Sequence, residues 1–351
     1  MPGQLGNPAL KPERSREFEI GFETSLLRNR ADVSYTHFSR RITDAIVNSP
    51  VAPSVGFPGF QVINVGRVAG WGNELSANVR VLDGRRVGWE IGTQLASNGN
   101  RIEDMGGTQF LTVGGGGQAQ NRVGYSIGDF FLYKVRDPKI DATGAPLIAQ
   151  SICDGGTGVG GLEQGGPDVS CSTAPRVFWG HSQPTWQAGL SNTVTLFERL
   201  RLYARVDGNG GHWQSDTEIR ALHNQGSTLA VLKKDDPFLQ VYRSIEADAV
   251  GTYRAGFLRL RELSATYTLD QRMAQRLRAS GATVSVAGRN LSMLWTAQHG
   301  WNTSRDGEIY VDIANQHVWD PEIRAVGQLS NGFQTILPPT ASFTTTLRLT
   351  F

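Results

Sequence analysis

Two cysteines are the first candidates for covalent chemistry in this 351-residue chain. Cys153 and Cys171 flank a glycine-rich stretch, residues 154–170. In an oxidising compartment they would form a disulfide, which would stabilise a loop of this length by about 3 kcal/mol through the entropy of the unfolded chain. No histidine or cysteine lies between them to complete a metal-ligand set. We therefore expect a disulfide, with two free thiols as the alternative.

The other residue types that carry chemistry do not show catalytic spacing. The six histidines are scattered, without the His-Glu-x-x-His spacing of a zinc hydrolase. The glycine-rich stretches 114–117 and 155–166 lack the lysine and following helix of a phosphate-binding loop, so we expect flexible loops there. Asp235 and Asp236 adjoin a proline, and adjacency alone does not make a glycosidase pair, which is a spatial arrangement. The sequence predicts a non-catalytic protein with no metal ion and no cofactor.

Composition excludes further classes of protein. The net charge of +2 leaves no broad basic surface for nucleic acid. The mean hydropathy is -0.28, and no apolar run reaches the roughly 18 residues of a membrane-spanning helix. Glycine accounts for 42 of the 351 residues, a share well above the usual value of about 7%. This excess favours an all-β chain with long loops.

Long alternating segments indicate that the strands are unusually long. Phe18, Ile20 and Phe22 alternate with Glu19 and Glu23 within residues 17–27. A membrane β-strand needs roughly 9–11 residues, whereas an average soluble strand has about 5–6. Similar alternation recurs along the chain and predicts about ten to twelve strands. It recurs at residues 31–47, 71–81, 87–95, 188–196, 200–206, 258–269, 283–291 and 342–351.

The connections between these segments are short and long in alternation. Residues 28–30 and 83–86 form short turns, whereas residues 47–68, 102–187 and 208–257 form long connections. This asymmetry is typical of an outer-membrane barrel, whose apolar strand face meets lipid and whose polar face lines the lumen. We expect an antiparallel transmembrane β-barrel with long extracellular loops. Plausible lumen-facing positions are Glu19, Glu23, Asn78 and Arg80.

One short helix and four loop aromatics complete the expected elements. Good helix formers over residues 270–278 predict a two-turn helix, with Asp270 as its N-cap and Gly281 closing it. Tryptophans in the long connections could stack on a sugar or an aromatic ligand, although packing and interfacial roles are the alternatives. These candidates are Trp179, Trp213, Trp301 and Trp319.

The chain ends on an apolar strand without a polar tail. Phe343, Leu347, Leu349 and Phe351 share one strand face, and the last residue is aromatic. Soluble chains usually end in residues that fray into solvent. This ending resembles the terminal signal strand that delivers bacterial outer-membrane barrels to their assembly machinery.

Several segments resemble TonB-dependent receptors, and the later ones resemble their SusC/RagA branch. Each match is weak alone, but their order extends over nearly the whole chain. The segments are Asn7–Arg14 followed by Glu17–Gly21, Ile63–Gly66 followed by Gly72–Leu75, Phe257–Leu263 with Tyr267, Gly288–Leu291, Asp320–Glu322, and Leu337–Thr340 with the final Phe351. Trp71 stands where asparagine is commoner in that family.

The resemblance implies a receptor with an N-terminal plug and a barrel of about 22 strands. Residues 1–351 would be the C-terminal part of that barrel, and we expect the plug, the TonB box and the signal peptide to be absent from them. The complete receptor would import a bulky nutrient, a glycan or a peptide, across the outer membrane. Its implied partners are outer-membrane lipid, the TonB complex through the missing plug, a SusD-like surface lipoprotein and the barrel-assembly machinery.

Two other classes remain open at this point. A soluble or surface β-sandwich could bind glycans through the loop tryptophans. A passive porin or an adhesin barrel would explain the long strands without a plug.

Overall fold

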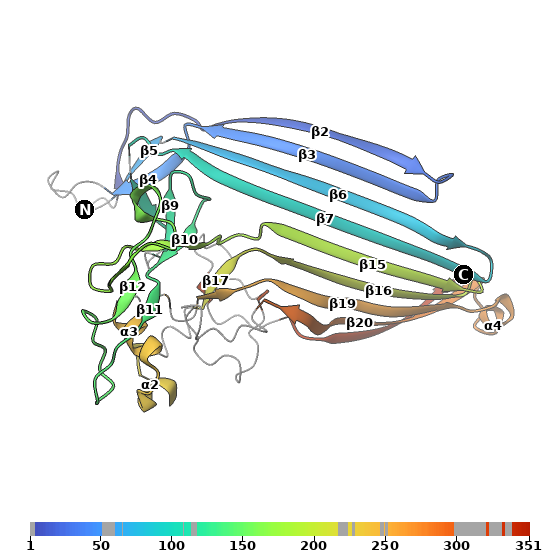
Figure 1. Cartoon of the computed structure of the whole chain (residues 1–351). Coiled ribbons are helices and arrows are strands. Elements are labelled where there is room, and N and C mark those ends of the chain that lie inside the picture. Colours follow the sequence, from blue (N-terminus) through green and yellow to red (C-terminus); the bar gives the residue numbers. More distant parts are fainter. Residues whose placement is uncertain are drawn as a thin grey trace.

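Nine long strands form one antiparallel sheet in the computed structural model of the chain (Figure 1). The structure describes residues 4–50, 60–64, 66–107, 109–113, 118–216, 224–226, 229–245, 249, 252–297, 321–322, 332–333 and 339–351. In order across the sheet, the strands are β2 (Arg14–Leu26), β3 (Ala31–Thr43), β6 (Arg67–Asp83), β7 (Val87–Asp104), β15 (Trp186–Leu196), β16 (Leu200–Gly210), β19 (Phe257–Thr268), β20 (Gly281–Thr296) and β22 (Ser342–Thr350).

Each strand of this sheet pairs with the next long strand along the chain. The β2–β3 ladder is continuous from Arg14–Thr43 to Leu26–Ala31, without a register shift. Within the described residues the sheet is open, with β2 and β22 at its edges. The antiparallel barrel wall predicted from the alternation is confirmed as a partial barrel. Its nine strands fall just below the predicted ten to twelve, because the other strands among the described residues are too short to cross a membrane.

The turns at one end of the sheet are tight. The β2–β3 turn uses three successive non-glycine residues with positive φ, namely Leu27, Arg28 and Asn29. Helix α4 (Gln271–Arg276) lies at the same end (Figure 1), and the Asp270 carboxylate accepts a hydrogen bond from the Met273 backbone N–H at 2.9 Å. The predicted helix and its N-cap are confirmed.

The predicted end of that helix is wrong. Gly281 is the first residue of β20 and does not close the helix. The chain leaves the helix at Leu277, and Arg278 takes the positive φ of 56° that usually falls to glycine.

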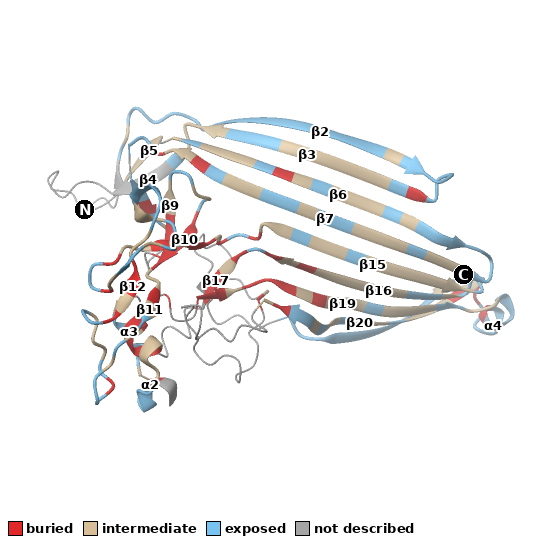
Figure 2. Cartoon of the chain, viewed as in Figure 1, coloured by how far each residue is buried: buried red, intermediate tan, exposed pale blue. Residues whose placement is uncertain are grey.

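The long connections at the other end fold into a layer with its own core. Small sheets and two helices, α2 (Leu229–Lys233) and α3 (Pro237–Ile245), build it. Figure 2 shows that buried residues gather in this layer, whereas the long strands are mostly half-buried or exposed. The layer strands are β8 (Phe110–Thr112), β9 (Ala119–Arg122), β10 (Asp129–Leu132), β11 (Val135–Asp137), β12 (Ile152–Asp154), β13 (Asp168–Ser170), β14 (Val177–Gly180), β17 (Trp213–Asp216), β18 (Thr252–Arg254) and β21 (Gly332–Phe333).

The apolar face of the nine-stranded sheet is uncovered. Phe18 is 62% exposed, Phe22 is 55% exposed and Val286 is 49% exposed. A β-sandwich would bury such a face against a second sheet about 10 Å away, so the sandwich alternative is wrong. Among the described residues, no helix is long and apolar enough to cross a membrane.

A matched pair of substitutions in β19 tests which face meets lipid. Leu263 is 46% exposed on the apolar face, and Ser264 lies on the opposite face. We expect Leu263→Arg to destabilise the barrel by about 2–4 kcal/mol, because the charge would enter the hydrocarbon. Ser264→Arg should have little effect, since its guanidinium would reach water. Urea unfolding of the full-length receptor in lipid vesicles measures both changes, and equal effects would contradict the assignment of the faces.

Candidate ligand-binding site on the polar face of the sheet

The strand register builds one continuous polar face. Residues in direct register across the strands are mostly polar or charged. One such row runs through Glu23, Ser34, Ser76, Gln94, Gly189, Asp207 and Arg259. The predicted lumen-facing residues Glu19, Glu23, Asn78 and Arg80 all occupy positions of this face, two on β2 and two on β6.

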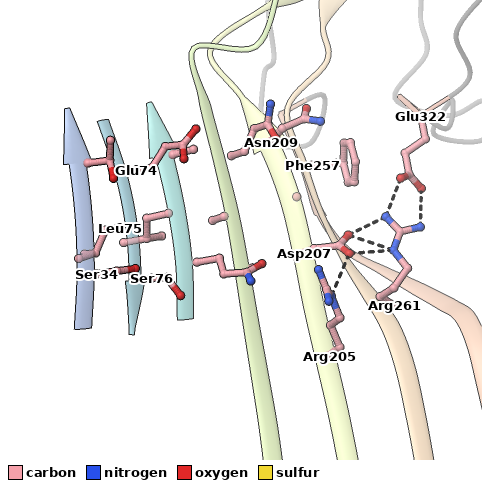
Figure 3. Close-up of a pocket in the computed structure, with 18 residues that line it drawn as sticks. Ser34, Glu74, Leu75, Ser76, Arg205, Asp207, Asn209, Phe257, Arg261 and Glu322 are labelled. Carbon is pink, nitrogen blue, oxygen red and sulfur yellow. Dashed lines mark hydrogen bonds and ion pairs between the residues drawn. The ribbon is translucent and has the colours of Figure 1, made fainter. Parts of the chain in front are cut away.

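A cavity of about 480 Å³ opens on this face (Figure 3). Six strands and one residue from the connection between β20 and β22, Glu322, contribute to its lining. Hydroxyl groups come from Ser34 and Ser76, and amide groups come from Gln94 and Asn209. Such a lining suits a hydrated polar ligand.

Arg261 is the centre of a charged cluster at one side of the cavity. Its Nε lies 3.0 Å from each carboxylate oxygen of Asp207, and its Nη2 lies 2.6 Å from Oδ1 of that residue. On its other side, Nη1 and Nη2 donate to the two oxygens of Glu322 at 3.1 and 2.6 Å. Asn290 Oδ1 accepts a further hydrogen bond from Nη1 at 2.9 Å. The guanidinium therefore joins two wall strands, β16 and β20, to a distant connection. Figure 3 shows its pairing with Asp207 and Glu322.

Two further arginines complete the charged cluster. Arg205 Nε lies 3.6 Å from Asp207 Oδ2, and Arg259 Nε lies 3.0 Å from Glu322 Oε2. Only 5% of the Arg259 side chain is exposed. A charge buried to this degree requires a counter-charge close by, and Glu322 supplies it here.

Irregular backbone explains how Arg261 reaches its partners. The pairing of β19 shifts register at this residue on both sides, because Leu260 and Glu262 pair with β16 and β20 but Arg261 does not. A β-bulge of this kind re-aims the side chain that it releases. On β20, Asn290 has a positive φ of 53°, which asparagine tolerates better than most residues.

The structure brings together motifs that are far apart in the sequence. The stretches Phe257–Leu263, Gly288–Leu291 and Asp320–Glu322 were singled out only for their family resemblance. They supply Arg259, Arg261, Asn290 and Glu322 to one cluster. The sequence contained these residues in recognisable motifs, but no spacing rule indicated that they meet.

The loop tryptophans have packing roles where the structure describes them. Trp179 is 6% exposed, and its ring meets that of Trp213 edge-on at 5.8 Å between centroids. Arg254 lies over the Trp213 ring at 5.2 Å. Stacking of a ligand on Trp179 would require the ring to leave this core. The other two candidates, Trp301 and Trp319, lie outside the described residues.

The glycine-rich stretch after Cys153 is ordered around one carboxylate, so its predicted flexibility is wrong. Asp154 accepts hydrogen bonds from the backbone N–H groups of Gly156, Gly165 and Gly166 at 2.8–2.9 Å, and pairs with Arg136 at 2.8 Å. Gly156 has a positive φ of 70°, and a Cβ there would lie 2.0 Å from a backbone oxygen. Burial opposes ionisation of Asp154, but the three backbone donors and Arg136 outweigh it and lower the pKa of the carboxyl group. The glycines allow the backbone to wrap this buried charge.

Cys153 and Cys171 are joined by a disulfide in the same layer. Both side chains belong to its buried core, with Phe130 and Tyr242 among their neighbours in the cluster. The bond holds β12 beside the segment that follows β13.

The C-terminal strand presents its apolar residues outward. Phe343 is 76% exposed, Leu347 is 57% exposed and Phe351 is 85% exposed, while Leu349 is half-buried opposite Ala282. This outward face agrees with a lipid-facing closing strand, and recognition of it by assembly machinery stays a prediction.

Known proteins match this architecture over most of the chain. The TonB-dependent receptor-like β-barrel family matches residues 2–291. The chain belongs to this family. TonB-dependent receptors are outer-membrane β-barrel proteins and non-catalytic, so this barrel lies in the outer membrane, and the passive porin and adhesin alternatives are set aside.

Individual relatives agree in sequence and in fold. TonB-dependent receptor P3 of Formosa agariphila is 22% identical over 82% of this chain and 30% of its own length, and receptor P26 of that organism is 27% identical over 32% and 11%. The RagAB peptide importer in its open-open state has the same fold, with a TM-score of 0.71 and 18% identity over 98% of this chain and 35% of that one. The RagAB peptide transporter gives a TM-score of 0.65 and 20% identity over 84% and 33%. The chain thus spans about a third or less of the proteins that it matches.

The disulfide of this TonB-dependent receptor barrel gives a direct chemical prediction. Alkylation of the protein isolated from cells should label neither Cys153 nor Cys171 before reduction and both after it. Cys153→Ser should destabilise the loop layer by about 3 kcal/mol, because the unfolded loop regains its entropy. Mass spectrometry and urea unfolding measure the two effects, and two free thiols in the isolated protein would contradict the pairing.

Acid should loosen the layer through Asp154. Because its folded-state pKa is lowered, its stabilising effect is complete above its unfolded-state pKa of about 3.9 and is lost as the pH falls through the folded-state value. We expect Asp154→Asn to destabilise the layer by about 3 kcal/mol near neutral pH and to remove this acid sensitivity. Hydrogen exchange of β12 as a function of pH measures both. Asp168→Asn is the control, because the Asp168 side chain is 66% exposed and should matter less.

Proposed function

We propose that this chain supplies barrel wall and ligand-contacting loops to an outer-membrane, TonB-dependent importer of a bulky nutrient. The observation that carries the proposal is the cavity on the polar face, which is lined by hydroxyl, amide and charged groups. A transporter needs such groups to replace the water around a polar cargo at several weak sites. The family match supports the same role.

The remaining parts of the importer would come from outside residues 1–351, which we take as the C-terminal part of the barrel. A plug would close the barrel and receive energy from the TonB complex. A SusD-like surface lipoprotein would capture the cargo above the loop layer. The RagAB likeness supports this arrangement, since that protein is a peptide importer of the same fold.

The cargo is a glycan or a peptide. The described part of the cavity is bordered by Arg205, Arg261, Glu74 and Asp207, with both charge signs represented. Its aromatic contribution is Phe257, which is only 3% exposed. Paired charges and amides of this kind favour a peptide, and RagAB as a peptide transporter supports that preference.

Growth experiments test the proposed transport. Deletion of the complete receptor gene should abolish growth on the cargo as sole nutrient, and inactivation of TonB should have the same effect on the same cargo. Uptake that persists without TonB would contradict an energised importer.

A matched pair of substitutions tests the use of the lumen face. Ser76 lines the cavity, and Ala77 is the next residue of β6 and faces lipid. We expect Ser76→Trp to reduce uptake at least about tenfold because the indole fills the cargo path. Ala77→Trp should leave uptake nearly unchanged, since aromatic residues are accepted on the lipid face. Radiolabelled cargo uptake in intact cells measures both, with receptor abundance as the control.

A further inference from the structure

Positive charge is concentrated in the four tight connections at one end of the sheet (Figure 1). These basic turns, β2–β3, β6–β7, β15–β16 and β19–β20, are residues 27–30, 84–86, 197–199 and 269–280. They contain two acidic residues and eight arginines, namely Arg28, Arg30, Arg85, Arg86, Arg199, Arg272, Arg276 and Arg278. Their surplus of six positive charges falls only to five when Asp83, the last residue of β6, is included, and the whole chain has a net charge of +2.

Backbone hydrogen bonds join the basic turns into one surface. The Phe197 N–H donates to the Arg86 carbonyl at 2.8 Å, which links β15–β16 to β6–β7. The Thr268 N–H donates to the Arg199 carbonyl at 2.9 Å, which links β15–β16 to the start of the next turn. A similar bond links β2–β3 to β6. The arginines are therefore held at fixed positions relative to one another.

Few of these arginines are neutralised by the chain itself. Arg85 Nε lies 3.3 Å from Glu198, but the two side chains are 94% and 64% exposed. Arg199 Nη1 lies 3.9 Å from Asp270. Exposed pairs of this kind contribute little. In the part of the chain that the structure describes, no carboxylate lies within 4.0 Å of the other six guanidinium groups, so the surface is open to an external anion.

Apolar side chains stand exposed beside the arginines in the turns. Leu27 is 72% exposed and Phe197 is 68% exposed. Both residues have positive φ, 55° and 52°, a conformation that glycine adopts at lower cost. Each turn thus keeps an apolar side chain at its tip against a backbone penalty, which favours a contact outside the chain.

Helix α4 repeats this combination on a regular scaffold. Residues four positions apart lie on the same side of a helix. Met273 and Leu277, which are 47% and 44% exposed, form an apolar pair, and Arg272 and Arg276 form a basic pair beside it. Ala274 is fully buried and holds the helix in place. Exposed apolar residues next to arginines are typical of a helix that lies at a membrane surface.

Two aromatic residues place the basic turns at the level of the lipid headgroups. Trp89 is the third residue of β7, and Tyr267 is the last but one of β19. Their register with Val194 and Leu200 puts both on the lipid face. Tryptophan and tyrosine gather at the interfaces of membrane barrels, whose short turns are periplasmic. The basic turns therefore lie where the phosphate groups of the periplasmic leaflet begin.

We propose that the basic turns and α4 form a binding surface for anionic phospholipids of the periplasmic leaflet. The guanidinium groups pair with lipid phosphates, for which arginine has a matching fork of donors. The neighbouring apolar side chains insert between the headgroups. The proposal depends on the outer-membrane location of the barrel and is independent of its cargo.

Lipid titration of the full-length receptor in neutral detergent tests the charge. Native mass spectrometry measures the affinities for phosphatidylglycerol and for phosphatidylcholine with the same acyl chains. Phosphatidylglycerol should bind at least about tenfold more tightly, and Arg272→Gln combined with Arg276→Gln should remove most of this difference. The same two positions changed to lysine should retain most of it, because lysine keeps the charge.

A matched pair of arginines on the polar face is the control. Arg201 and Arg348 are exposed near the same end of the barrel, but their register with Thr195 and Thr283 places them on the lumen face. Arg201→Gln combined with Arg348→Gln should leave both affinities unchanged. An equal loss in this control would overturn the proposal. Equal affinities of the unsubstituted receptor for the two lipids would also overturn it and would point to an acidic protein segment as the partner.

Glycerol 3-phosphate separates a lipid from a soluble phosphate. It carries a phosphate group without acyl chains, so a large excess should leave phosphatidylglycerol bound to the receptor. Displacement would overturn the assignment to lipid and would assign the surface to a soluble phosphate.

A second matched pair tests the insertion of the apolar side chains. Phe197→Asn should weaken the binding of both lipids by the same factor, at least about threefold, because it removes apolar contact without changing charge. Asparagine also tolerates positive φ. Leu232→Asn is the control, because Leu232 is similarly exposed (66% against 68%) but lies in the loop layer. Heat-modifiable migration on gels checks folding, and equal effects of the two substitutions would overturn the insertion.

Discussion

The structure depends on the ladders of backbone hydrogen bonds that join its long strands. In hydrocarbon, a strand has no water to satisfy its N–H and C=O groups, so each strand must pair along its length with its neighbours. The β2–β3 and β3–β6 ladders meet this requirement for thirteen successive residue pairs each. Once the register is fixed, the two faces are fixed with it, because successive side chains point to opposite sides. The lipid face and the lumen face are therefore two results of one constraint.

The ladder is interrupted where the polar face carries its densest charge. Arg261 stands outside the pairing on both sides, and Asn290 adopts a left-handed conformation beside it. Local irregularity of this kind is tolerated where the released side chain makes strong contacts. Here the contacts are carboxylates from a wall strand and from a distant connection, so one departure from regular pairing couples the wall to the loop layer.

The sequence predicted features that depend on local periodicity. Alternation of Phe18, Ile20 and Phe22 with Glu19 and Glu23 identified the strand and both of its faces, and Asp270 identified the start of α4. It could not predict the glycine stretch around Asp154, because wrapping a buried carboxylate depends on Arg136 and on how the backbone donors of Gly156, Gly165 and Gly166 fold back onto it. Glycine-rich composition is equally compatible with a flexible loop and with tight backbone packing.

The charged cluster was beyond prediction for a related reason. Each of its residues lay in a motif that could be recognised, but their meeting depends on two register shifts and on the return of a long connection to the wall. Neither the register shifts nor the return of the connection produces a periodic pattern in the sequence. Family resemblance indicated which segments matter, and only the three-dimensional arrangement gave them a common role.

The unequal lengths of the strands have a mechanical consequence. β6 and β7 have 17 and 18 residues, whereas β22 has 9, and a tilted strand crosses the bilayer with about 9–11. Roughly seven residues of β6 and β7 therefore rise above the membrane, which is about 23 Å of stiff ribbon measured along the strand. These protruding ends of β6 and β7 support the folded loop layer. A force applied to that layer would be carried along these two strands into the wall.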